Sequence, residues 1–179
     1  MSPLLRNTLR FIALMLVQVF LTKITLRWWT APQDHVLFIP YIYPLFILLL
    51  PFETSVPLML GLGFAAGISV DAMQNTAGMH AAATVLMAYL RTNVLSSLLP
   101  KNLAEYPAQS PGVRNMGWAP FLTYAAFLLV IHHFTFFIIE HWSFSNMGYT
   151  LLKVLASTVT SLLCVVVYLL LFTRQASRA

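Results

Sequence analysis

The sequence predicts an all-α fold, a polytopic membrane helix bundle with about six transmembrane helices in a single domain, residues 1–179. The first observation is composition: 59% of residues are hydrophobic and 8% are charged, against about 45–50% and about 25% in soluble domains. The second is that the apolar residues fall into runs near the roughly 20 residues that cross a bilayer. A chain of 179 residues cannot bury this much apolar surface in a soluble core.

The expected helices follow these apolar runs: 8–25, 35–51, 56–72, 79–99, 118–142 and 149–172. The first run follows basic residues but no small-residue cleavage site comes after it, so we expect an uncleaved helix and not a signal peptide. The second run is the least regular, because Pro40 and Pro44 interrupt it. A kinked, tilted or partly re-entrant second element is therefore an alternative to a regular transmembrane helix in this run.

Basic residues set the expected orientation. The net charge is +5, and the segment 100–117, rich in Pro and Gly, is the only long polar loop. Six basic residues share one side in a six-span topology, namely Arg6, Arg10, Lys101, Arg114, Arg174 and Arg178. Three fall near the other side, namely Lys23, Arg27 and Lys153. This bias predicts cytoplasmic termini and a cytoplasmic loop 100–117. With no basic stripe, nucleic acid is excluded and membrane lipid is the expected contact of these charges.

A row of small residues marks the third expected helix. Gly63, Gly67 and Asp71 are four residues apart, so they share one helix face, and Gly78 closes the turn that follows. In lipid such a row lets another backbone approach closely. Two interpretations are open: Asp71 caps the turn, or Asp71 and the glycine row form a docking groove for a partner's transmembrane helix or a ligand.

Three further polar residues, Arg91, His132 and Glu140, fall inside apolar runs, where an unpaired charge costs about 2.5–3.5 kcal/mol. Arg91 either extends to the interface or pairs with Asp71 or Glu140. His132 and Glu140 lie on roughly one face of their helix, and hydrogen bonds to neighbouring helices are the simplest explanation for them.

No catalytic, cofactor or metal motif is present. The chain lacks His-Glu-x-x-His, Gly-x-Ser-x-Gly and a Gly-rich phosphate loop, and it has a single cysteine, Cys164. Haem ligation between His80 and His132 or His133 is disfavoured because we expect these histidines at different depths. The sequence thus predicts a protein that is not an enzyme and has no cofactor; a small membrane enzyme with dispersed acid and base residues is the weaker alternative.

Several segments together resemble the rod shape-determining protein MreD family. They are the row from Gly63 to Asp71 followed by Gly78-Met79-His80-Ala81-Ala82-Ala83-Thr84, and Tyr89-Leu90-Arg91. Upstream are Tyr41-Ile42-Tyr43-Pro44-Leu45 and Leu50-Pro51-Phe52-Glu53-Thr54, and downstream is Ile131-His132-His133-Phe134. In outline the resemblance covers nearly the whole chain.

The resemblance implies a scaffold in the bacterial inner membrane that maintains rod cell shape within the cell-wall elongation complex, or elongasome. It implies binding to an MreC-like protein, which links cytoskeletal MreB to peptidoglycan synthesis by a RodA-type glycan polymerase and a class B penicillin-binding transpeptidase. It also implies a fold similar to the substrate-binding subunits of energy-coupling-factor transporters. The alternative function is such a subunit for a small, vitamin-type molecule, with Asp71, His80, Glu140 and His141 lining its pocket.

Overall fold

The computed structural model describes residues 3–28, 37–99, 105–106, 109–142 and 146–172, and all regular secondary structure in these ranges is helical. The helices are α1 Pro3–Trp28, α2 Leu45–Leu48, α3 Val56–Gln74, α4 Met79–Leu98, α5 Val113–Met116, α6 Trp118–His141 and α7 Met147–Phe172. The prediction of an all-helical bundle is therefore confirmed.

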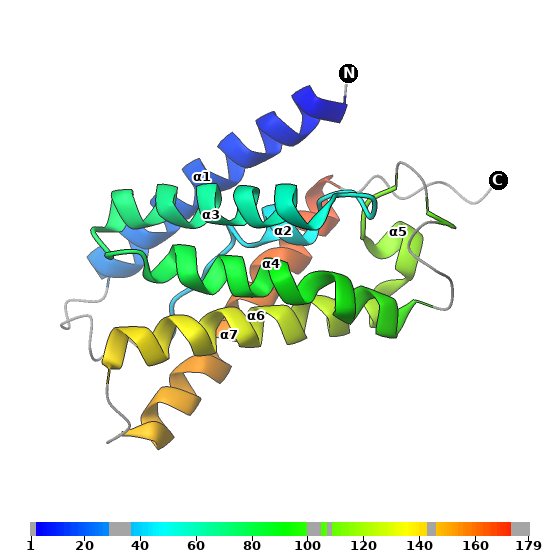
Figure 1. The fold of residues 1–179 in the computed structure, drawn as a ribbon. Helices are drawn as coiled ribbons and strands as arrows, with labels where there is room; N and C mark the ends of the chain where they lie inside the picture. Colours follow the sequence, from blue (N-terminus) through cyan, green and yellow to red (C-terminus); the bar gives the residue numbers. More distant parts are fainter. Residues whose placement is uncertain (1–2, 29–36, 100–104, 107–108, 143–145, 173–179) are drawn as a thin grey trace.

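Three helices form a layer, and two more cross it. In Figure 1, α3, α4 and α6 lie side by side with α4 in the middle, while α1 and α7 run obliquely across them. The turn between α3 and α4 uses two left-handed residues, Asn75 (φ 57°) and Gly78 (φ 83°). A glycine tolerates this conformation without a steric penalty, so Gly78 fixes a tight antiparallel hairpin.

Four of the described helices are long and apolar enough to cross a membrane: Asn7–Ile24 within α1, and the whole of α3, α6 and α7. Helix α4 is of similar length, with 20 residues, or about 30 Å. It is less apolar because it carries the buried polar residues His80, Thr84 and Arg91. Its position between α3 and α6 gives those polar groups protein neighbours instead of lipid (Figure 1).

The second expected helix is corrected by the structure. Residues 37–44 are not helical, and only the four residues of α2 follow before the chain leaves toward α3. Every residue from 41 to 50 is buried. Pro40 and Pro44 explain the break, because each lacks the N–H that a helix needs at that position. Of the predicted range, residues 35 and 36 lie outside the described residues.

The other long helices begin and end close to their expected boundaries, with α1 extending further at both ends. The predicted loop 100–117 contains the short helix α5, and parts of this loop lie outside the described residues. The beginning of α1, helix α5 and the end of α7 lie around one cavity, so they share one end of the bundle. Which side of a membrane this end faces stays a prediction.

Candidate functional site

The non-helical segment, residues 37–44, needs hydrogen-bond partners, because a backbone N–H buried among apolar helices has no water to bind. Two serines of α7 provide them. Ser157 Oγ accepts the Ile39 N–H at 3.0 Å, and Ser161 Oγ accepts the Tyr41 N–H at 2.9 Å. The serines are four residues apart, so a single face of α7 supports two alternate residues of the non-helical segment.

Gln18 of α1 supports the same segment from another side. Its Oε1 accepts the N–H of Ile42 at 2.8 Å and of Tyr43 at 3.3 Å, while its Nε2 donates to the Pro40 carbonyl at 3.3 Å. Gln18 is buried, and its amide offers both donors and an acceptor. One side chain thus satisfies three backbone groups of the non-helical segment.

The carbonyl groups at the end of α2 are satisfied by Arg91 and Tyr124. Arg91 donates from Nη2 to the Leu50 carbonyl and from Nε to the Tyr124 hydroxyl at 3.1 Å. Tyr124 in turn donates to the Leu48 carbonyl at 3.1 Å. A cation beside the last carbonyls of a helical turn is electrostatically favourable. The partners of Arg91 are therefore neither Asp71 nor Glu140, and its side chain does not extend to the interface, because it is fully buried.

The centre of the site is the hydroxyl of Tyr43, which is surrounded by three polar side chains. It lies 3.1 Å from His80 Nδ1, 2.9 Å from Thr84 Oγ1 and 2.6 Å from His132 Nε2. All four side chains are buried. The extended segment, α4 and α6 thus meet at one oxygen atom.

Counting protons assigns the donors. His80 Nε2 lies 3.3 Å from Gln74 Oε1, an oxygen that only accepts, so a neutral His80 carries its proton on Nε2. Its Nδ1 then accepts from the Tyr43 hydroxyl, and the Tyr43 oxygen accepts from His132 Nε2–H. A neutral His132 consequently has a bare nitrogen at Nδ1, and this buried atom has no hydrogen-bond partner within the described part of the chain.

His133 makes a separate bridge between α6 and α7. Its Nδ1 donates to the Leu129 carbonyl at 2.7 Å, and its Nε2 lies 3.2 Å from Ser161 Oγ. Because Ser161 already accepts the Tyr41 N–H, its own proton goes to His133. The Tyr41 ring stacks on His133 with centroids 5.4 Å apart and meets the edge of His80 at 4.8 Å.

Asp71 is a cap for α4. Its Oδ1 accepts the His80 N–H at 3.0 Å and the Thr76 hydroxyl at 2.7 Å, and its Oδ2 accepts the Ala81 N–H at 2.9 Å. These are orphan donors at the start of a helix, which a carboxylate satisfies well. Both carboxylate oxygens are occupied, as the capping interpretation requires.

The glycine row packs against α4 of the same chain. A Cβ on Gly67 would lie 2.6 Å from both the Ala81 nitrogen and the His80 oxygen, and one on Gly63 would lie 3.2 Å from Ala88 Cβ. The close approach expected for this row is thus filled internally. A partner helix or ligand would reach the row only by displacing α4, and docking at Gly63, Gly67 and Asp71 stays a prediction.

Glu140 lies near the C-terminal end of α6 and forms an ion pair with Lys153 of α7. The Lys153 Nζ and Glu140 Oε2 atoms are 2.9 Å apart. Lys153 is 1% exposed while Glu140 is 28% exposed, so the lysine is the more deeply placed partner. The Lys153 ammonium also lies 4.6 Å from the centre of the Phe137 ring.

The expected difference in depth between His80 and His132 is corrected as well. Their ring centroids are 6.3 Å apart, because α6 continues to His141 and so extends past the start of α4 at this end. Even so, the described residues include no group of three or more His, Cys, Asp and Glu side chains placed to hold a metal ion.

The arrangement joins extended backbone to helices through neutral side chains. Neither a protein-family model, nor a curated protein, nor a solved structure matches this chain. The chemical interpretation therefore comes from the geometry. The side chains of Tyr43, His80 and His132 can exchange protons across these hydrogen bonds. Their hydrogen-bonding groups, however, point toward one another.

Sequence reasoning missed Gln18, Tyr43, Ser157 and Ser161 as site residues. A signal for the last two is present, since Lys153, Ser157 and Ser161 stand four apart in a largely apolar helix and form one polar stripe. The stripe predicts a polar neighbour for α7. It does not identify the extended segment as that neighbour.

Proposed function

We propose that this protein is a non-enzymatic, multi-pass membrane scaffold that holds other membrane proteins in place. Following its resemblance to the MreD family, we place it in the elongation complex of the bacterial inner membrane. Its expected direct partner is an MreC-like protein. Through that partner it links MreB to the RodA-type polymerase and the class B transpeptidase.

One observation carries the scaffold proposal: most of the polar side chains buried in the described part of the bundle bind the chain's own backbone or one another. Gln18, Ser157 and Arg91 each satisfy backbone groups of the segment between α1 and α3. Such groups serve to hold an unusual backbone path rigid, and a rigid membrane surface suits a protein that positions partners.

The outer faces of α1 and α7 provide apolar surface for such contacts. Exposed large side chains occur along both helices: Leu9, Leu16, Phe20, Leu155, Val159 and Leu170. In a membrane these faces contact lipid or another transmembrane helix, and packing between helices there depends on shape more than on apolarity.

The transporter alternative has less support. It required a polar pocket lined by Asp71, His80, Glu140 and His141. Asp71 and His80 are bonded to each other through the His80 N–H, and Glu140 is paired with Lys153. These groups are therefore occupied by partners within the chain.

Site-specific photo-cross-linking in native membranes tests the scaffold proposal. We expect a photoreactive residue at Phe20 or Val159 to capture one membrane protein in good yield, with mass spectrometry identifying an MreC-like chain. Phe127, equally exposed but on α6, is the matched control. Equal capture of many unrelated proteins from all three positions would refute a specific scaffold.

A further inference from the structure

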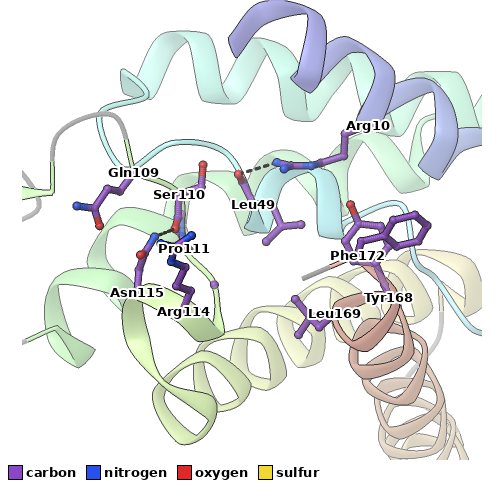
Figure 2. Close-up of a pocket in the computed structure, with 11 residues that line it drawn as sticks. Arg10, Leu49, Gln109, Ser110, Pro111, Arg114, Asn115, Tyr168, Leu169 and Phe172 are labelled. Atoms are coloured by element: carbon purple, nitrogen blue, oxygen red, sulfur yellow. Dashed lines mark hydrogen bonds between the residues drawn. The ribbon is translucent and has the colours of Figure 1, made fainter. Parts of the chain in front are cut away.

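A polar cavity of about 510 Å³ lies where α1, α5 and α7 meet at one end of the bundle. Figure 2 shows Arg10 entering it from α1 and Arg114 from α5, with Tyr168 and Phe172 of α7 along another side. The segment before α5 completes the wall with Gln109 and Ser110. With Leu49 after α2, residues from four distant parts of the chain build this cavity.

The charge of the cavity is positive. Arg10 donates one N–H to the Leu49 carbonyl at 3.1 Å, and a guanidinium has five N–H donors in all. Arg114 is exposed, and neither arginine forms an ion pair within the described residues. No acidic side chain is among the described residues that line the cavity. The cavity thus presents unpaired donors suited to a phosphate group.

An apolar groove of about 390 Å³ begins where the cavity ends. It runs between α1 and α7, and its walls include Ala13 and Val17 on one side and Leu163 and Val167 on the other. Tyr168 and Phe172 line both the groove and the cavity, so the two are neighbours on α7. A charged recess and an apolar groove thus lie next to each other at this end of the bundle.

We infer that the cavity and the groove together bind one anionic, phosphate-bearing lipid. The phosphate lies between Arg10 and Arg114, and one hydrocarbon chain lies along the groove between α1 and α7. A transmembrane helix would fill the groove but leave the arginine donors unmatched, whereas a phospholipid satisfies both parts. This inference is independent of the scaffold proposal.

Native mass spectrometry of the full-length protein in a neutral detergent tests it, with three probes: phosphatidylglycerol, phosphatidylcholine and glycerol phosphate. We expect phosphatidylglycerol to bind about tenfold more tightly than phosphatidylcholine, as expected for charge-assisted hydrogen bonds. Glycerol phosphate, which lacks a chain to fill the groove, should bind far more weakly than phosphatidylglycerol. Equal binding of the two lipids, or equal binding of glycerol phosphate and phosphatidylglycerol, overturns the inference.

Matched variants assign the binding to this site. Arg114→Gln, which removes no hydrogen bond seen among the described residues, should abolish most of the preference for phosphatidylglycerol, while Lys23→Gln on the exposed face of α1 should keep it. Val17→Trp fills the groove, and Leu16→Trp places the same ring on the neighbouring lipid-facing side. If Arg114→Gln and Val17→Trp bind phosphatidylglycerol like their controls, the lipid lies elsewhere and the inference fails.

Discussion

The Tyr43 hydroxyl lies 2.6 Å from His132 Nε2, although the two residues are 89 positions apart in the chain. This bond connects the turn before α2 to the middle of α6. The same Tyr43 oxygen also contacts His80 Nδ1 and Thr84 Oγ1, so one atom makes hydrogen bonds to three side chains.

Removing that oxygen should destabilise the protein. In Tyr43→Phe, His80, Thr84 and His132 all lose a buried partner, and we expect the free energy of unfolding to fall by about 2 kcal/mol. Unfolding of the purified protein in mixed detergent micelles measures the change. Tyr89→Phe, which removes an exposed hydroxyl from α4, is the control and should change stability little. Equal effects in the two variants would contradict a structural role for the Tyr43 hydroxyl.

The effect on stability of adding a methyl group to a glycine of α3 should depend on what that methyl group would contact. Gly67→Ala drives a Cβ into the α4 backbone, so we expect a loss of about 1–3 kcal/mol from overpacking. Gly61→Ala in the same helix meets nothing within 4 Å, and it should be neutral or stabilising by up to about 1 kcal/mol. Thermal unfolding of both variants checks the difference, which vanishes if α4 does not pack on Gly67.

Loss of the Arg91 guanidinium should loosen α2. Arg91→Met leaves the Leu50 carbonyl and the Tyr124 hydroxyl without their donor, and we expect a cost of about 2–3 kcal/mol. Hydrogen exchange should show faster exchange at the amides of residues 45–50. Asn93→Met, an exposed change in α4, should leave their exchange unchanged, and protection that persists in Arg91→Met would disprove the cap.

The Glu140–Lys153 pair should show strong non-additivity. Glu140→Gln leaves the almost fully buried Lys153 ammonium without its counter-charge, and we expect a loss of about 2 kcal/mol, below the value for fully buried pairs because Glu140 is part-exposed. Adding Lys153→Met should restore part of that stability. A double variant as unstable as the sum of the single variants would show that the two charges are not coupled.

The sequence predicts the long helices well because their apolar runs are continuous and end at Pro, Gly or charged residues. It does not predict the path of residues 37–50. The run Leu45–Leu50 is as apolar as a transmembrane helix, and Pro40 and Pro44 reveal a break without revealing its shape. That shape depends on Gln18, Ser157 and Ser161, whose positions in space only the fold determines.

The candidate site shows the same division. Gly63, Gly67 and Asp71 do share one face, as their spacing requires, but spacing does not state which helix they meet. The sequence predicts Arg91 inside a helix with Asp71 or Glu140 as its partner, because opposite charges are the only partners for an arginine that a sequence identifies. Backbone carbonyls cannot be identified as partners in this way, because every residue carries one.

The position of Ser157 and Ser161 in the chain has a consequence for folding. The Ile39 and Tyr41 amides bind side chains that lie 118 and 120 residues later in the chain. When residues 37–44 leave the ribosome, those serines have not yet been translated. The two amides therefore reach these partners only after α7 has been made, so the packing of this early segment depends on the last of the described helices.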